Sequence, residues 1–203
     1  MARRSNIMPP AVGESPESCR RCELWEGATQ AVEGEGAPRA AIMLVGEQPG
    51  NDEDREGHPF IGPAGRLLDQ LLEQAGISRS RVFVTNAVKH FRWEPRGKRR
   101  LHKRSALRHI EACKVWLLQD IAAHRPRVIV ALGATALRAL SGSAASIAAL
   151  RGRSITHQSG AHLIASYHPS AILRADESGA EALTRDLIED LRLAGRMAAA
   201  NES

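Results

Sequence analysis

The sequence contains no apolar run long enough to cross a membrane, and no apolar stretch follows Arg3 and Arg4 as a secretion signal would require. We therefore expect an intracellular, cytoplasmic protein with no membrane partner. Cysteine is also scarce, because the chain has only three, too few for a metal site of four thiolates. Disulfides are rare in intracellular proteins, so cross-links are not expected. No internal repeat is visible.

The chain has 203 residues, enough for a single domain with a substantial core. We expect a flexible polar tail at residues 1–17, one domain at 18–197 and a short tail at 198–203. Strands are expected at residues 40–45, 81–88, 127–132 and 161–166, and helices at 63–75, 105–124 and 181–197, with a short helix ending near residue 140. This alternation predicts a three-layer α/β/α sandwich with a central, mostly parallel sheet.

Positive charge is concentrated in one block, although the net charge is only +5. Between residues 89 and 108 the only acid is Glu94. The basic residues of the block are Lys89, Arg92, Arg96, Lys98, Arg99, Arg100, Lys103, Arg104 and Arg108. Such a block indicates a polyanionic partner, most commonly nucleic acid. The alternative is a solvated helix face, which Pro95 and Gly97 disfavour because they interrupt a helix.

A loop rich in glycine and proline, residues 45–65, separates the first strand from the first helix. Loops of this length are usually functional, although an acidic surface loop is the simpler alternative. Glu47 and Gln48 follow the first strand, Asn86 ends the second, and His168 follows the last. Singly, Asn86 could be a turn residue and His168 a packing residue. Parallel strands end on the same side of a sheet, so we expect these side chains to converge on one crevice.

Several motifs of the chain resemble those of uracil-DNA glycosylases, and more narrowly of the iron–sulfur family-four branch. They are GEQPG at 46–50, HPFIGPAG at 58–65, TNAVK at 85–89 and HPS at 168–170. The insert KRRLH at 98–102 resembles the KRRIH loop of UdgX-type proteins, which attack uracil-containing DNA and stay covalently attached to it. Two departures are Gln48 for the alanine of GEAPG and Leu101 for isoleucine. Asn51 stands where an acid is expected.

The resemblance implies roles that agree with the chemistry of the residues. A base that leaves the stack is held by stacking and by its Watson–Crick edge, which suits Phe60 and Asn86. Asn86 can accept from uracil N3–H and donate to O4, a pattern that cytosine reverses. His168 is expected to donate to O2 as the leaving base gains charge. Glu47 is expected to stabilise the sugar cation or the attacking group, and Gln48 to bind uracil too.

The resemblance also implies a four-iron, four-sulfur (4Fe–4S) cluster. Cys19 and Cys22 have the spacing of metal ligands, and Cys113 lies on an expected helix. In family four the third ligand follows the lysine of the TNAVK motif, and that position is His90 here. The predicted ligands are therefore Cys19, Cys22, His90 and Cys113, with histidine ligation raising the reduction potential. The alternatives are a zinc site with the same ligands, or a His90 that only caps the strand.

The expected partner is uracil-containing DNA. Contacts with DNA are predicted for Lys98, Arg99, Arg100, Lys103, Arg104 and Ser170, the basic ones with phosphates. Phosphate contacts give an affinity that falls with salt. We expect single-stranded DNA to be preferred, because no obvious intercalating residue stands in the short loop that could open a duplex.

His102 is the predicted nucleophile. A neutral imidazole can attack an electrophilic sugar carbon, and four cations nearby in the sequence should keep His102 neutral. These cations are Arg99, Arg100, Lys103 and Arg104. The expected product is a covalent bond between His102 and C1′ of the abasic site. Alternatives are a phosphate contact by His102, an ordinary glycosylase that releases abasic DNA, or a non-catalytic nucleic-acid-binding module.

Overall fold

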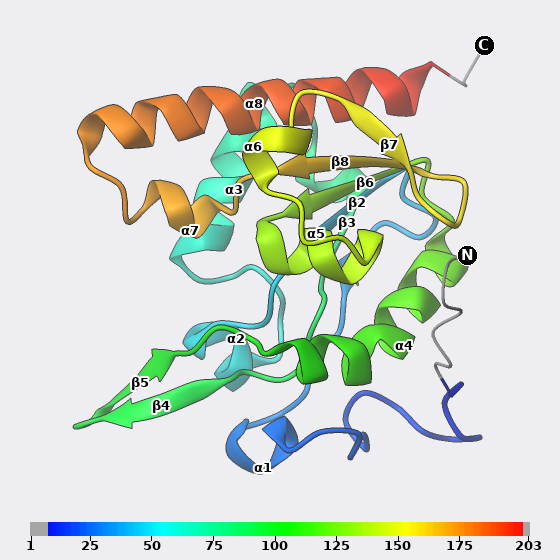
Figure 1. The fold of residues 1–203 in the computed structure, drawn as a ribbon, viewed down its shortest axis with the longest axis vertical. Helices are drawn as coiled ribbons and strands as arrows, with labels where there is room; N and C mark the ends of the chain where they lie inside the picture. Colours follow the sequence, from blue (N-terminus) through cyan, green and yellow to red (C-terminus); the bar gives the residue numbers. More distant parts are fainter. Residues whose placement is uncertain (1–7, 201–203) are drawn as a thin grey trace.

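The fold is built on a six-stranded sheet with the strand order β1-β3-β2-β6-β8-β7 (Figure 1). The structure is a computed structural model that describes residues 8–200. The strands are β1 (Glu35–Gly36), β2 (Ile42–Gly46), β3 (Val82–Asn86), β6 (Val128–Leu132), β7 (Ser154–Thr156) and β8 (His162–Ser166). The four central strands are parallel, and β1 and β7 are antiparallel edges. The predicted strands are confirmed, each slightly shorter than expected.

Helices cover both faces of the sheet, which confirms the three-layer α/β/α sandwich (Figure 1). One face packs against α3 (Pro63–Gln74) and α8 (Glu177–Ala199), the other against α4 (Leu107–His124) and α5 (Ala134–Ser141). Side chains of β2 alternate between the two cores: Ile42 and Leu44 face one, Met43 and Val45 the other. Parallel strands buried on both faces require such apolar runs, so the strands could be found from sequence.

The loop at residues 45–65 is not structureless, contrary to expectation, because it contains the helix α2 (Asn51–Glu56). Gly57 ends α2 in the left-handed region at φ 84°, and three acids occupy its first turn. Acids favour a helix N-terminus, but six polar residues carry no apolar periodicity from which to predict a helix. Other short elements are α1 (Leu24–Gly27), η1 (Arg79–Arg81), α6 (Ile147–Leu150) and α7 (Pro169–Ile172).

The basic block folds as a hairpin of β4 (Trp93–Arg96) and β5 (Arg99–His102), separate from the main sheet. The prediction that no helix forms there is confirmed, whereas the hairpin was missed. Its two-residue turn has Gly97 first, with φ 58°, as a type II′ turn requires. Figure 1 shows the hairpin projecting from the body of the fold.

The described residues include part of each predicted tail. Within residues 8–17, Met8 and Pro9 carbonyls accept hydrogen bonds from Arg21, and Glu14 forms an ion pair with it. Helix α8 continues to Ala199, two residues past the predicted domain end at 197. Residues 1–7 and 201–203, where the rest of the tails was predicted, lie outside the described residues. No helix within residues 8–200 is both long and apolar enough to cross a membrane.

Candidate active site

Phe60, Asn86 and His168 lie close together at the carboxyl ends of the parallel strands. Gly46 of β2 lies opposite Asn86 of β3 in the sheet register. A Cβ atom on Gly46 would stand 2.4 Å from Asn86 Oδ1 and 2.7 Å from Phe60 Cζ, so only glycine lets both side chains approach. The rings of Phe60 and His168 are stacked, with centroids 6.1 Å apart. Because the sequence predicts that they hold a flipped base, we call these three residues the base slot.

Phe60 is held in an unusual backbone conformation, with φ 59°. A non-glycine residue with positive φ is strained and persists only where its surroundings enforce it. A Cβ on Gly65 would lie 1.7 Å from the Phe60 carbonyl oxygen, so the start of α3 presses directly against the Phe60 backbone. Buried Glu53 accepts a hydrogen bond from Gly62 N at 3.0 Å and fixes the same loop. The glycines of HPFIGPAG thus serve to orient Phe60.

His168 is held as a neutral imidazole with a defined tautomer. Burial, and secondarily Arg174 and His102, lower the pKa of His168 to about 4. Its Nδ1 accepts the backbone N–H of Ser170 at 3.1 Å, so Nδ1 carries no proton. The proton of the neutral ring is therefore on Nε2, which can donate to an acceptor in the base slot. The side chain of Ser170 contacts the same atom, because its Oγ lies 2.8 Å from Nδ1 of His168.

Glu47 projects from the end of β2 and bridges two other segments. Its Oε1 accepts the backbone N–H of Ser105 at 2.7 Å, and its Oε2 accepts the Thr135 hydroxyl at 2.9 Å. Each oxygen keeps a free lone pair after these contacts. Desolvation lowers the pKa of His102, and the charge of Glu47 raises it by less. The Glu47 carboxylate therefore lies within electrostatic range of that imidazole.

Gln48 is placed differently from the prediction that it binds uracil. Its Nε2 donates to the carbonyl oxygens of Arg92 at 3.0 Å and Lys103 at 3.2 Å. Its Oε1 accepts the Ser105 hydroxyl at 2.5 Å. Carbonyl oxygens can only accept, so these partners determine the orientation of the amide. Gln48 therefore ties together the two ends of the β4–β5 hairpin.

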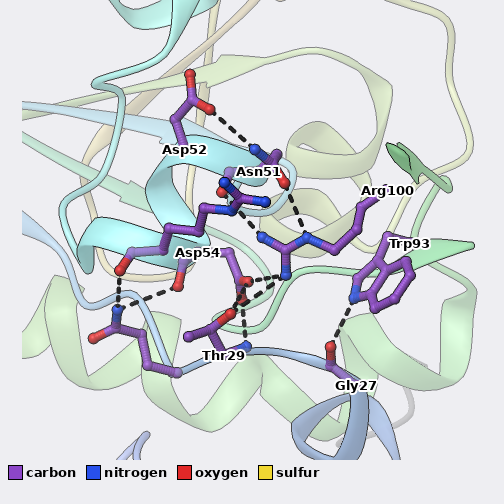
Figure 2. A network of polar contacts seen from close by, with 9 residues as sticks. Gly27, Thr29, Asn51, Asp52, Asp54, Trp93 and Arg100 are labelled. Carbon is purple, nitrogen blue, oxygen red and sulfur yellow. Dashed lines mark hydrogen bonds and ion pairs between the residues drawn. The ribbon is translucent and has the colours of Figure 1, made fainter. Parts of the chain in front are cut away.

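Arg100 also faces the protein interior and not the solvent, as Figure 2 shows. Its Nη1 lies 2.6 Å from Oδ2 of fully buried Asp54, and its Nε donates to Asn51 Oδ1 at 2.9 Å. Thr29 donates twice more to Asp54. The predicted phosphate contact of Arg100 is therefore corrected to an anchor between hairpin and α2. The amide oxygen of Asn51 accepts there, at the position where an acid was expected.

His102 ends β5, opposite Trp93, with its ring centroid 6.0 Å from that of Phe91. His102 is exposed to solvent, yet partial desolvation by the surrounding protein lowers its pKa. Arg174 lowers the pKa further. The expected neutral imidazole is thus supported, but the four cations of the hairpin are not the cause.

The remaining predicted DNA contacts lie on the surface of the hairpin. Lys98, Arg99 and Arg104 are exposed, and Lys103 is exposed in an ion pair with Glu94. Beyond the hairpin, sequence reasoning missed two residues that follow α7. Arg174 affects the pKa of both His102 and His168, and its neighbour Leu173 is 52% exposed. Leu173 is thus an exposed, large apolar side chain beside Arg174, and the sequence analysis did not single it out.

Cys19, Cys22 and Cys113 lie together in one core layer, and all three are free thiols. Cys113 Sγ accepts the backbone N–H of Lys89 at 3.2 Å, and Cys19 Sγ accepts the indole N–H of Trp116 at 3.3 Å. Burial raises the pKa of the Cys113 thiol to about 12, and the other two cysteines add to this effect. N–H groups directed at sulfur are typical of thiolates that bind iron–sulfur clusters.

His90 directly follows Lys89 and is buried. Burial lowers the pKa of His90, which keeps its imidazole in the form that ligates metals. Within residues 8–200, no three His, Cys, Asp or Glu side chains are close enough to hold a single metal ion. Three thiols and a neutral imidazole are a donor set that suits either an iron–sulfur cluster or a zinc ion.

A cavity of about 710 Å³ lies at the opposite, amino-terminal end of the strands. It is lined by Leu118, Ile121, Arg125, His157 and His162, among others, and by none of the predicted site residues.

Comparisons with known proteins agree with the resemblance seen in the motifs. Residues 33–192 match the family described as the uracil DNA glycosylase superfamily. A type-4 uracil-DNA glycosylase of Thermotoga maritima is 39% identical over 184 residues, which cover 90% of this chain and 91% of the relative. One from Sulfurisphaera tokodaii is 37% identical over 170 residues, covering 80% and 74%. A type-5 uracil-DNA glycosylase of Pyrobaculum aerophilum is 31% identical over 169 residues, covering 75% and 71%.

Proposed function

The chain belongs to the uracil-DNA glycosylase superfamily, and we propose that it excises uracil from DNA and then remains bonded to the sugar through His102. The type-4 relatives support the excision of uracil. The covalent step is supported by one observation: the pKa of His102 responds to the charge of Glu47, and the pKa of His168 responds to His102. The proposed nucleophile, carboxylate and donor to the leaving base thus lie within electrostatic range of one another.

Uracil recognition is assigned to the base slot. A flipped base stacks on Phe60, whose strained conformation is enforced by the glycines around it. Asn86 is buried and rigidly packed, so its amide accepts from uracil N3–H and donates to O4 without reorganising. Cytosine presents the opposite pattern and leaves both groups unpaired, which disfavours its binding.

Cleavage of the glycosidic bond is assisted by His168. As the bond between C1′ and N1 breaks, negative charge develops on N1 and O2 of uracil. The Nε2 proton of His168 is the donor proposed for that charge, and the low pKa keeps the ring a neutral donor. Pre-organised donors of this kind are typically worth about 10²–10³ in rate.

The covalent step joins His102 to C1′. The imidazole lone pair attacks the electron-poor sugar carbon as the bonding pair leaves with uracil. The imidazole then bears a positive charge, and Glu47, whose charge raises the pKa of His102, would stabilise it or take up the N–H proton. The resulting bond from carbon to nitrogen has a poor leaving group, so we expect the adduct to persist.

A four-iron, four-sulfur cluster is proposed on Cys19, Cys22, His90 and Cys113. Such a cluster supplies a covalent cross-link between the N-terminal segment, the segment after β3 and α4. We assign it a structural role, since it would fix the strand that carries Asn86. Protein purified without oxygen should be brown, with about four iron and four sulfide per chain. Colourless protein with one zinc would contradict this assignment.

DNA binding is proposed for the exposed basic residues Lys98, Arg99, Lys103 and Arg104, with Ser170 and, in addition, Arg174. Single-stranded DNA is the proposed preferred substrate, because a paired uracil must first be unstacked at a cost of a few kcal/mol. Leu173 is the exposed apolar side chain that could offset part of that cost in a duplex.

A denaturing gel with an end-labelled uracil oligonucleotide tests the proposal. We expect a slowly migrating band that resists heat and detergent, and no such band with a thymine oligonucleotide. Multiple turnovers with release of abasic DNA would identify an ordinary glycosylase. Absence of any uracil release would identify a module that binds without catalysis.

A further inference from the structure

Asp190 is a fully buried carboxylate, 0% exposed, on the apolar face of α8. Its neighbours on that face, Leu187, Leu191 and Ala194, pack against the sheet. Burying a carboxylate is unfavourable unless hydrogen bonds and charges compensate it. An apolar residue would suit this position better for stability alone, so the contacts of Asp190 indicate what it contributes.

The partners of Asp190 lie on two segments that meet at the end of β8. Its Oδ2 accepts the Ser166 hydroxyl at 2.7 Å, and its Oδ1 accepts the backbone N–H of Gly152 at 3.0 Å. The Nε of Arg151 is 3.4 Å from Oδ2. The Arg151 guanidinium also lies 6.0 Å from the ring of Tyr167. Asp190 thus joins α8 to the segment before β7 and to the last residues of β8.

Ser166 is held from two sides, and it lies two residues before His168. Its side chain donates to Asp190, while its carbonyl accepts the N–H of Gly133 at 2.8 Å. Gly133 in turn touches His168, because a Cβ on Gly133 would stand 3.2 Å from His168 Cβ. The point at which the chain leaves β8 toward His168 is therefore fixed by a buried charge on one side and a glycine turn on the other.

We propose that Asp190 is a positioning residue for His168, acting through Ser166. This inference rests on the proposed role of His168 in uracil excision. A donor that must reach O2 of the leaving base tolerates little displacement, since an error of about 1 Å can cost about 10²-fold in rate. Asp190 holds the strand end that sets this distance and touches no substrate itself.

A double-mutant cycle under single-turnover conditions tests the proposal. Asp190→Asn should slow adduct formation by about 10- to 100-fold in the wild-type background. In a His168→Ala background the same substitution should change the rate by less than about twofold, because the group it positions is gone. Asp186→Asn is the matched control: Asp186 is on α8 and pairs with Arg151 at 3.2 Å. It should stay within about twofold of wild type.

Equal slowing in both backgrounds, or no slowing in either, would overturn the proposal. If Asp190→Asn fails to fold, Ser166→Ala removes the same link and should show the same dependence on His168. Nitrogen-15 NMR of the histidine rings separates this inference from the proposed function. Asp190→Asn or Ser166→Ala should shift the His168 ring signals, and Asp186→Asn should not, even if the protein excised no uracil. Unshifted His168 signals would also overturn the proposal.

Discussion

The base slot and the β4–β5 hairpin hold their functional side chains in different ways. Phe60, Asn86 and His168 are packed at the ends of the main sheet, where apolar cores and close glycine contacts leave no alternative position. His102 ends a two-stranded hairpin outside that sheet, held by the polar anchors Gln48 and Arg100. The residues proposed to recognise the base thus belong to the main fold, whereas the position of the proposed nucleophile depends on a few hydrogen bonds. Substitutions should therefore separate uracil excision from adduct formation.

Removal of the nucleophile should separate the two activities most strongly. His102→Ser is expected to abolish the adduct and to admit water to the vacated space. Uracil release should persist within about tenfold, because the base slot is untouched. Gel shift and uracil release are measured on the same samples. An adduct that survives in His102→Ser would show that another residue is the nucleophile.

A substitution that loosens the hairpin should slow adduct formation and leave the rate of uracil excision unchanged. Arg100→Lys keeps the charge but loses the paired contacts with Asp54 and Asn51, so we expect adduct formation to slow by about tenfold or more. In a His102→Ser background, Arg100→Lys should change uracil release by less than about twofold. Arg185→Lys is the matched control, since its ion pair with Glu181 on α8 is exposed and contributes at most about 1 kcal/mol to stability.

Because the base slot and the hairpin are held in different ways, they also differ in how far their residues could be predicted from sequence. Glu47, Asn86 and His168 follow apolar strands, so the rule for parallel sheets located them. The inward direction of Arg100 depends on the hairpin folding back onto α2, 46 residues away from Asp54 in the chain, and no periodic pattern reports such a contact. The hydrogen bonds of Gln48 to the carbonyl oxygens of Arg92 and Lys103 also join distant parts of the chain, so they too could not be predicted from a sequence pattern. Neutrality of His102 was predicted from charge, but it arises chiefly from burial, which only the fold reveals.

The pH dependence of the adduct should report on the hairpin alone. Burial places the pKa of His102 below its ordinary value of 6.5. Protonation removes the attacking lone pair, so the adduct rate should be constant near neutral pH and fall as pH decreases through that pKa. His168, with a pKa of about 4, stays neutral over this range. Uracil release by His102→Ser should lack the decrease above pH 5; the same decrease there would assign the titration to another group.

The smallest expected effect is a difference in excision rate between duplex and single-stranded DNA. Leu173→Ala should slow excision from duplex DNA by about three- to tenfold, because an apolar side chain helps to unstack a base. Excision from single-stranded DNA should be unaffected, and it should be the faster reaction with the unaltered protein. Equal rates on both substrates would remove the proposed preference.

Intact-mass spectrometry of the protein after incubation with a uracil oligonucleotide tests the central claim most directly. We expect a species with the mass of the protein plus the oligonucleotide minus uracil, and a digest that places the sugar on His102. A species of unmodified protein mass beside free abasic DNA, or a modified peptide that lacks His102, would contradict it.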